Sequence, residues 1–328
     1  MRLKHLLGCA LGLFVAYFLT FPVFAQSPEP WPTKSITMVV PFPPGGVADA
    51  VGRPVAEALS RILGQPVIVE NKAGAGGGIG MAAVARAKPD GYTILMALSS
   101  ISIIPEADKV VGREQSFQLS QLKPIARFTA DPTVLVVRAD SPWKDYKAFV
   151  AAMRANPGKY NFGSSGNYGT MHVPMEMLKS SEKFYMVHIP YTGAGPAIVG
   201  LLGGQVDAIA TGPSSIVQQL KAGKVRALAH WGDGRLASMP DVPSFKEMGV
   251  KVEFSQWAGL FVPSATPDYI TNRLREAAKQ AASDERVRAV INGAGSPIQY
   301  MDAPEFKVYW DKESAQMGEV IRKIGKVE

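Results

Sequence analysis

The sequence predicts an α/β fold organised in two domains. Short runs rich in β-branched residues alternate along the chain with segments whose apolar residues recur at helical spacing. The 328 residues are 47% hydrophobic and 19% charged, enough to bury the cores of two domains of ordinary size. Because no internal repeat or low-complexity linker separates the domains, we expect the chain to cross between them within folded strands, near residues 127–132 and 254–259.

The predicted elements alternate in type. The strands cover residues 36–40, 67–70, 93–97, 133–137, 206–210, 227–229 and 259–262. The helices cover residues 50–63, 80–87, 143–155, 197–202, 214–222, 268–283 and 304–324, with a further helix from about 171 to 180. Such alternation is typical of parallel sheets flanked by helices, and we therefore expect parallel sheets.

The N-terminal segment has the pattern of a signal peptide. Arg2 and Lys4 precede an uncharged apolar stretch over residues 6–21, and Val23 and Ala25 are small residues at the positions that a signal peptidase reads. We expect cleavage after Ala25. The alternative is a membrane anchor, although about 16 apolar residues are fewer than the roughly 20 needed to span a bilayer.

Removal of this segment also removes Cys9, the only cysteine. The mature chain then has no disulfide, and a structural zinc site is not expected. Its formal charge falls from +7 to +5, with 33 basic and 28 acidic residues. A mild positive excess suits a small anionic ligand, but the basic residues are too scattered for a nucleic-acid groove.

The turn that follows the first strand is the first candidate binding element. Pro41-Phe42-Pro43-Pro44-Gly45-Gly46 ends the strand over 36–40 and precedes Asp49 and the helix over 50–63. A helix that opens on such a turn presents free backbone N–H groups, which attract a carboxylate or a phosphate. The alternative is an ordinary strand-to-helix turn, in which proline and glycine are common.

A second glycine cluster, over residues 74–80, invites comparison with a dinucleotide-binding loop. The spacing fails, because Ile79 and Met81 occupy the positions where the third glycine is required. No Gly-Lys-Ser/Thr phosphate loop occurs in the chain. We interpret the cluster as a tight turn that lets a helix pack closely on the sheet, and we expect no cofactor.

A third cluster, over residues 163–170, combines glycines with small hydroxyl side chains ahead of a helix, an array of donors that suits one carboxylate. A nucleophile elbow around Ser165 is broken by Asn167, which occupies the final glycine position. His172 is close enough in sequence to activate Ser165, but we expect it to be packed against its own helix. His188 and His230 have no neighbouring ligand at metal spacing, so no metal site is predicted.

Eight motifs, taken in order, carry a family resemblance over the whole chain from Trp31 onward. They are Pro41-Phe42-Pro43-Pro44-Gly45-Gly46-x-x-Asp49, Val69-Glu70-Asn71-Lys72-x-Gly74-Ala75-Gly76-Gly77, Pro89-Asp90-Gly91-Tyr92-Thr93, Gly163-Ser164-Ser165-Gly166-Asn167, His188-x-Pro190-Tyr191, Leu201-Leu202-Gly203-Gly204-Gln205-Val206, Gly223-Lys224-Val225-Arg226-Ala227-Leu228-Ala229 and Pro240-Asp241-Val242-Pro243. The chain resembles the Bug-type extracytoplasmic solute receptors, the binding components of tripartite tricarboxylate transporters.

The resemblance implies the type II fold of periplasmic binding proteins, with two α/β domains that close on a small carboxylate. Domain 1 would comprise residues 26–129 and 256–328, and domain 2 residues 130–255. The expected protein is a periplasmic monomer that delivers a di-, tri- or aromatic carboxylate to a membrane permease, without catalysis. The implied ligand-binding residues are Phe42, Pro44, Gly45, Gly46, Asp49, Ser99, Ser100, Ser164, Ser165, Gly166, Asn167, Gly169, Thr170, Tyr191 and Thr211.

Three departures from the family pattern make the expected pocket wall less polar. Val47 and Ala48 replace the more usual Pro-Thr type of pair. Residues 97–101 lack the usual glycine and threonine, and Ile104 stands where asparagine is usual. Residues 210–213 lack the usual Phe-Asp-Asn type of sequence. We therefore hypothesise a ligand with one well-held carboxylate and an apolar or aromatic body. Two alternatives stay open, a receptor that feeds a sensory pathway and a secreted serine hydrolase that uses Ser165 and His172.

Overall fold

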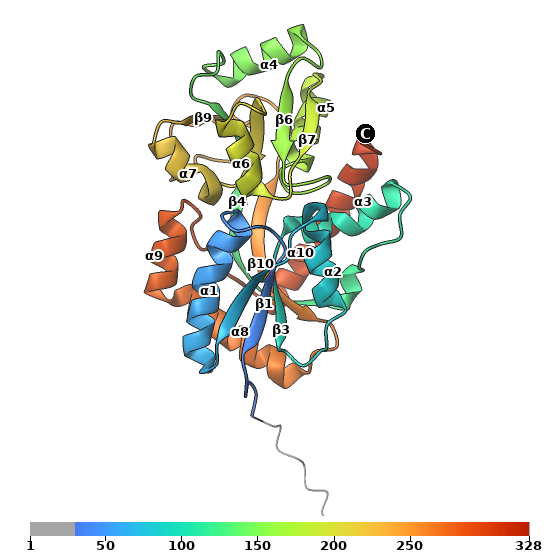
Figure 1. Cartoon of the computed structure of the whole chain (residues 1–328), viewed down its shortest axis with the longest axis vertical. Helices are drawn as coiled ribbons and strands as arrows, with labels where there is room; N and C mark the ends of the chain where they lie inside the picture. Colours follow the sequence, from blue (N-terminus) through green and yellow to red (C-terminus); the bar gives the residue numbers. More distant parts are fainter. Residues whose placement is uncertain (1–29, 328) are drawn as a thin grey trace, which may run out of the picture. The chain divides into compact units, whose positions relative to one another are not determined.

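Two mixed β-sheets organise the chain, for which a computed structural model describes residues 30–327 (Figure 1). The predicted signal peptide and the alternative membrane anchor lie outside these residues. Within residues 30–327, no helix has the length and apolar character needed to cross a membrane. The residues from Pro32 onward form one unit, which is described below.

The first sheet has the strand order β11-β4-β10-β3-β1-β2. Its strands are β1 (Ile36–Val40), β2 (Val67–Asn71), β3 (Thr93–Leu98), β4 (Leu122–Pro132), β10 (Ser255–Pro263) and β11 (Met301–Asp302). Strand β1 is buried and pairs in parallel with both β2 and β3. Consequently the turns that follow these three strands emerge at one edge of the sheet.

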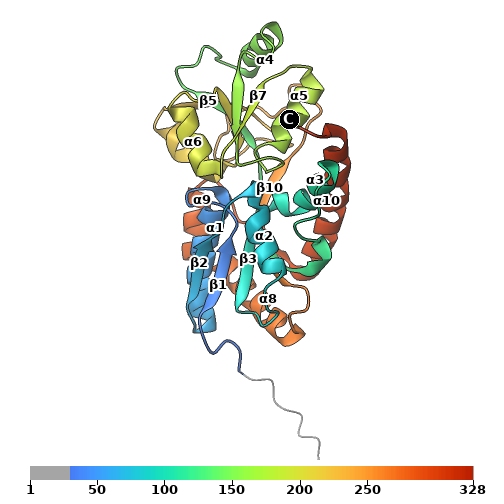
Figure 2. The ribbon, with the colours of Figure 1, turned by 45° about the vertical axis from the view of Figure 1, so that its right-hand side comes forward.

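The second sheet has the order β7-β6-β8-β5-β9. Its strands are β5 (Val134–Arg138), β6 (Asn161–Ser164), β7 (Val187–Pro190), β8 (Ala208–Thr211) and β9 (Val225–His230). Strand β6 pairs in parallel with β7 and β8. We call the first sheet with its helices lobe 1 and the second sheet with its helices lobe 2 (Figure 2).

The prediction of parallel sheets was wrong, because both sheets are mixed. Strand β10 is antiparallel to β3 and β4, and β5 is antiparallel to β8 and β9. The reason lies in the crossovers. Strand β4 leads into β5 across the single residue Thr133, and β10 carries the chain back to the first sheet. These connecting strands do not belong to βαβ units, so the parallel rule does not apply to them.

Ten α-helices cover the sheets in the described part of the chain. They are α1 (Val47–Leu63), α2 (Gly78–Ala85), α3 (Ile104–Val110), α4 (Tyr146–Ala155), α5 (Val173–Glu182), α6 (Ala194–Leu202), α7 (Pro213–Lys221), α8 (Asp268–Ser283), α9 (Glu285–Gly293) and α10 (Ala303–Ile324). Helix α10 packs on β4 and α3 of lobe 1 and also contacts α5 of lobe 2. Three short 3-10 helices complete the fold, namely η1 (Ala75–Gly77), η2 (Ser99–Ser102) and η3 (Leu119–Gln121).

Helix α1 shows how the sequence positions a turn. Its apolar residues Val51, Val55 and Leu59 recur at helical spacing and are fully buried, and each such side chain contributes about 1.5–3 kcal/mol on burial. The helix ends at Gly64, whose left-handed φ of 69° favours glycine. Burial of this face fixes the first turn of the helix in place beside β1.

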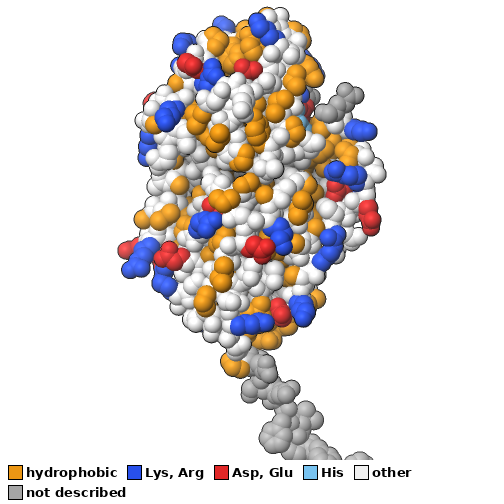
Figure 3. Space-filling view, viewed as in Figure 1, with side chains coloured by type: hydrophobic (Ala, Val, Ile, Leu, Met, Phe, Trp, Pro, Cys, Tyr) orange, Lys and Arg blue, Asp and Glu red, His pale blue; other side chains and the backbone are white. Residues whose placement is uncertain are grey.

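Charged side chains of both signs are interspersed over the face of the molecule drawn in Figure 3. This agrees with the scattered charge in the sequence.

Lobe 2 has its own apolar core, in which Val134, Met171, Leu201, Ile209 and Ile216 are buried together.

Candidate ligand-binding cleft

Loops from the two lobes meet where strands of both sheets end. A Cβ built on Gly46, in the β1–α1 turn, lies 3.5 Å from the Cβ of Ala194 at the start of α6. A Cβ built on Gly76 lies 3.0 Å from the carbonyl oxygen of Asn167, in the β6–α5 loop. Residues of both lobes, including Ala75 of lobe 1 and Asn167 of lobe 2, line a cavity of ≈ 890 Å³. The lobes are therefore closed on each other.

The β1–α1 turn is shaped by Asp49. Its carboxylate accepts a hydrogen bond from the Gly45 N–H (3.1 Å) and from the Asn71 side chain (3.1 Å), and it pairs with Arg53 at 2.8 Å. The hydrogen bond to Asp49 raises the pKa of the Arg53 guanidinium. Asp49 is thus satisfied by its own lobe, and its contacts with Gly45 and Asn71 hold the shape of the turn.

The other predicted residues of this turn lie at the lobe boundary or beneath it. Phe42 is buried, and its ring lies 2.9 Å from a Cβ built on Gly77. The carbonyl oxygen of Pro44 faces Gly195 of lobe 2, at 3.0 Å from a Cβ built there. Phe42 therefore supports the turn, whereas Pro44 contacts the opposite lobe.

The β6–α5 loop is held by two histidines. The Ser164 hydroxyl accepts a hydrogen bond from the Gly166 N–H (3.1 Å) and lies 2.6 Å from His188 Nε2. His172 Nδ1 accepts a hydrogen bond from the Tyr168 N–H at 2.8 Å, and the rings of His172 and His188 stack at 4.0 Å. Burial, reinforced by the neighbouring His172, lowers the pKa of His188 to about 3, so its ring is neutral at physiological pH.

These contacts bear on the hydrolase alternative. His172 is fully buried, as expected for a packed residue, and its Nε2 lies 3.5 Å from Glu176. The Ser165 hydroxyl has no hydrogen-bond partner among the described residues. His172 thus contacts Tyr168 and Glu176, and no hydrogen bond joins it to Ser165 among the described residues.

Three buried hydroxyl groups without partners come directly after strands β3 and β6. Ser99 and Ser100, at the end of β3, are fully buried, and Ser165 is 3% exposed. None of these three hydroxyls has a hydrogen-bond partner in residues 30–327. A buried polar group without a partner is costly, so each such group in a native protein requires an explanation, of which a bound molecule is one.

Sequence reasoning missed Gln256. This residue begins the buried part of β10, is 2% exposed, and donates a hydrogen bond from its side-chain amide to the Thr170 hydroxyl of lobe 2. Its Oε1 has no partner among the described residues and faces Gly212, at 2.5 Å from a Cβ built there. The signal available in the sequence was the amide side chain of Gln256, which lies within the predicted crossover at residues 254–259.

The remaining predicted residues differ in their surroundings. Asn167 is exposed, and it lines the ≈ 890 Å³ cavity together with Gly166 and Tyr191. A Cβ built on Gly169 lies 2.8 Å from the Ser165 hydroxyl. Thr211 is buried and its hydroxyl lies 2.7 Å from that of Ser215, within lobe 2.

In the described residues, no group of three or more His, Cys, Asp or Glu side chains is arranged to hold a metal ion.

Two α/β lobes joined by crossover strands, with glycine-rich loops of both lobes in contact, define a two-domain binding protein of the periplasmic type. A model of the tripartite tricarboxylate transporter family receptor (TctC) matches residues 51–326, and the chain belongs to this family. Among curated relatives, protein BugT of Bordetella pertussis is 31% identical over 334 residues, covering 99% of each chain.

Solved structures agree with this assignment. The periplasmic binding protein BugD superposes with a TM-score of 0.84 at 31% identity, covering 90% of this chain and 98% of BugD. MatC from Rhodopseudomonas palustris, solved with bound malate, superposes with a TM-score of 0.83 at 28% identity, covering 89% of this chain and 100% of MatC. The fold predicted from the sequence, that of a two-domain periplasmic binding protein, is therefore confirmed.

Proposed function

We propose that this protein is a periplasmic receptor that reversibly captures a small carboxylate between its lobes and delivers it to a membrane permease. The observation that carries the proposal is the set of buried, unpartnered hydroxyls of Ser99, Ser100 and Ser165, which follow strands β3 and β6. Hydroxyl donors and free amides at helix N-termini suit a carboxylate, whereas a purely apolar ligand would leave them unsatisfied.

The two domains are proposed to be residues 26–129 with 256–328, and residues 130–255. The change of sheet between β4 and β5, and the return at β10, support these boundaries. Strands β4 and β10 would then act as the hinge. Ligand would stabilise the closed form through its greater affinity for that form.

The ligand-binding residues named from the sequence are retained as a proposal, except that Phe42 and Asp49 would support the β1–α1 turn instead of contacting the ligand. Ser99, Ser100, Ser165 and the amides around Thr170 would contact the carboxylate, and Gln256 is added to them. Asp49 would act indirectly by shaping the β1–α1 turn, because its carboxylate is already paired with Arg53.

We further propose a di-, tri- or aromatic carboxylate as the ligand class. MatC, which shares the fold at 28% identity, was solved with bound malate. This supports a small carboxylate as the ligand. The apolar residues Val47, Ala48 and Ile104 favour a ligand with an apolar body beyond its carboxylate. Reversible binding without catalysis is supported by the absence of a Ser165–His172 hydrogen bond among the described contacts.

The test begins with protein purified from the periplasm. Native mass spectrometry would identify any copurified carboxylate, and N-terminal sequencing would check for Gln26 as the first residue. A thermal-shift panel of mono-, di-, tri- and aromatic carboxylates follows, with malate as the first compound. A midpoint that rises with ligand concentration, as mass action requires, supports the proposal.

If no carboxylate is copurified and no compound of the panel shifts the midpoint, carboxylate binding is rejected. Turnover of any compound would instead favour the hydrolase alternative. Delivery to a permease is tested separately, by measuring uptake of the identified ligand in cells with and without the receptor gene.

A further inference from the structure

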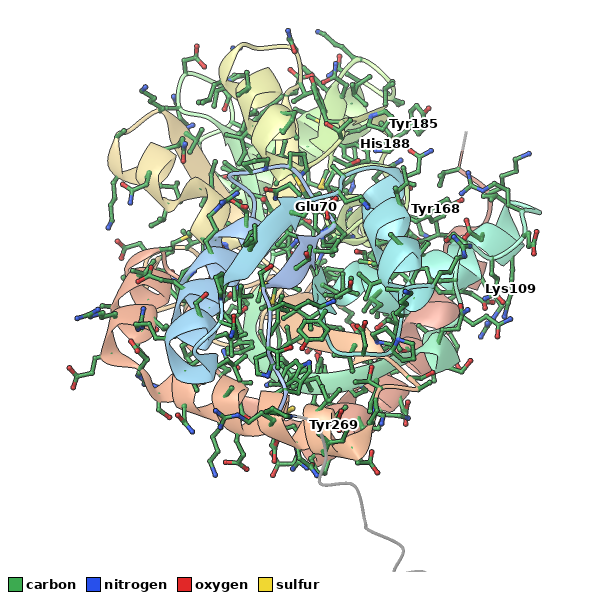
Figure 4. The ribbon with its side chains drawn as sticks, turned by 60° about the horizontal axis from the view of Figure 1, so that its bottom comes forward. Glu70, Lys109, Tyr168, Tyr185, His188 and Tyr269 are labelled. Carbon is green, nitrogen blue, oxygen red and sulfur yellow. The ribbon has the colours of Figure 1, made fainter. Side chains whose placement is uncertain are left out.

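A second groove lies outside the cleft, beside the C-terminal end of α10. We call it the C-terminal groove. It has a volume of ≈ 720 Å³ and is lined by Lys179, Tyr185, His188, Lys251, Lys323 and Lys326, among others. Figure 2 shows the end of α10 beside α5, and Figure 4 shows Tyr185 and His188 on this side of the molecule. Nothing in the proposed carboxylate site accounts for it.

The rim of this groove is positively charged. Lys251, Lys323 and Lys326 are exposed, and none of them forms an ion pair with another residue in the described part of the chain. The acidic side chain in the lining, Glu176, is paired with Lys179 at 2.6 Å. Within residues 30–327, the exposed rim therefore carries three lysines without an ion-pair partner.

An aromatic side chain accompanies these charges. Tyr185 is 56% exposed, which is high for a large side chain, and the ammonium of Lys179 lies 5.2 Å from its ring centroid. Exposed tyrosine side chains are enriched in protein interfaces. A pocket for a small anion would instead place its positive groups inside, where water is excluded.

The groove is assembled from both lobes. Tyr185 and His188 belong to lobe 2, whereas Lys323 lies on α10, which packs on β4 of lobe 1. The chain beyond α10 continues to the β6–α5 loop, where the Tyr168 hydroxyl donates to the Gly325 carbonyl (3.0 Å) and accepts from the Val327 N–H (3.0 Å). Separation of the lobes would pull these two walls apart.

The same groove contacts the support of the binding loop. His188 lines the groove, and its Nε2 lies 2.6 Å from the Ser164 hydroxyl, which in turn accepts from the Gly166 N–H. A molecule seated in the groove would thus touch residues that hold the β6–α5 loop in its closed position.

We propose that the C-terminal groove docks an acidic segment of a partner protein, and that it does so in the closed form of this receptor. Charge complementarity selects an acidic partner, and exposure of the rim lysines selects a macromolecule over a small anion. Because the walls come from two lobes, the partner would distinguish closed from open protein. This inference goes beyond the proposed function, since it concerns a separate surface and requires no knowledge of the solute.

The experiment uses a closed form that needs no ligand. Gly46→Cys and Ala194→Cys place two Cβ atoms about 3.5 Å apart, within the range that a disulfide spans. In a Cys9→Ser background these thiols are the only two. Binding of a fluorescein-labelled (Glu-Ser)6 peptide is measured by fluorescence anisotropy, with the oxidised and reduced forms compared.

We expect the oxidised form to bind the peptide at least fivefold more tightly than the reduced form. K251E/K323E/K326E should weaken binding at least tenfold. The matched control K88E/K144E/K221E changes three exposed lysines elsewhere and should weaken it less than threefold. Uptake assays play no part here, so failure of this test is separate from failure of the proposed function.

Several results would overturn the proposal. Equal losses in the groove and control variants would mean non-specific attraction, and equal binding by oxidised and reduced protein would remove the dependence on closure. Displacement of the peptide by low-millimolar inorganic phosphate at constant ionic strength would identify a small-anion site. Dimerisation of the oxidised form in analytical ultracentrifugation would identify a second copy of the chain as the occupant.

Discussion

Gly76 of lobe 1 and Gly166 of lobe 2 meet backbone to backbone, and a Cβ built on Gly166 lies 2.9 Å from the amide nitrogen of Gly76. Because both contacting groups belong to the main chain, no flexible side chain can move aside to make room for a Cβ at Gly166. Gly166 also has a φ of 112°, which other residues rarely adopt. The closed arrangement of the lobes therefore depends on glycine at this position.

Gly166→Ala is expected to weaken carboxylate binding at least tenfold, because the added methyl group opposes closure. The control is Gly64→Ala, which also places alanine at a positive φ but has no atom within 4 Å of the new Cβ. Both variants should lose about 1 kcal/mol of stability from backbone strain. Isothermal titration with malate, or with the ligand found first, measures the affinity. Equal affinities in the two variants would show that this contact does not control closure.

Ser165→Ala tests the role of an unpartnered hydroxyl. The variant should bind the ligand roughly tenfold more weakly, because one hydrogen bond contributes about 1 kcal/mol or somewhat more. The ligand-free variant should unfold at the same temperature as the wild type or higher, because a buried group without a partner is removed. Thermal unfolding and titration are measured on the same samples. A lower unfolding temperature with unchanged affinity would assign Ser165 a structural role.

The sequence was sufficient to predict the elements whose apolar pattern is regular. Strand β1 and helix α8 have the predicted bounds, since the first is a continuous buried run and the second has a clear helical period. Strand β6 was missed because its four residues include Gly163 and Ser164, which have low β propensity. Helix α9 was missed because only Val287 and Ile291 of its nine residues are buried, too few for a clear helical period, although Asp284 caps its start.

Residues of the cleft were predictable where a local motif carries them. The β1–α1 turn and the β6–α5 loop are contiguous in sequence, so their glycines and hydroxyls were found. Gln256 contacts Thr170, which lies 86 residues earlier, and this contact exists only because the crossover strand β10 passes beside lobe 2. The role of His188 likewise depends on the pairing of β6 with β7, which brings it to Ser164.

His188→Asn should flatten the dependence of stability on pH. Burial lowers the pKa of His188 from 6.5 to about 3, so the unfolded chain binds more protons than the folded one between these values. The free energy of unfolding therefore falls as the pH drops from 6.5 towards 3, and His188 accounts for roughly 2–4 kcal/mol of that fall. Urea unfolding at pH 7 and pH 4.5 measures the difference.

The matched control for this prediction is Ser164→Ala, which removes the hydroxyl at 2.6 Å but keeps the buried imidazole. Its stability should retain the slope of the wild type, since burial is the main cause of the lowered pKa. If His188→Asn keeps the wild-type slope as well, another group is responsible for the acid sensitivity.

Glu313 has the opposite effect on the pH dependence of stability. This residue of α10 accepts hydrogen bonds from the Ser102 hydroxyl and from the Trp257 indole N–H (3.1 Å), and burial raises its pKa from 4.5 to about 7 despite them. Between these pH values the folded protein binds more protons than the unfolded chain. The contribution of Glu313 is therefore complete below pH 4.5 and is lost as the pH rises through 7.

Glu313→Gln keeps a neutral side chain of the same shape at every pH, so it should match the wild type at pH 5 and exceed it by roughly 2 kcal/mol at pH 8. Urea unfolding at the two pH values measures this change. Asp131, whose pKa burial also raises to about 7, is present in both proteins and cancels from the comparison. Glu319→Gln removes an exposed carboxylate from the same helix and should not reproduce the gain at pH 8. A Glu313→Gln variant that is destabilised equally at both pH values would mean that Ser102 and Trp257 require a carboxylate, and that its hydrogen bonds outweigh the cost of burying its charge.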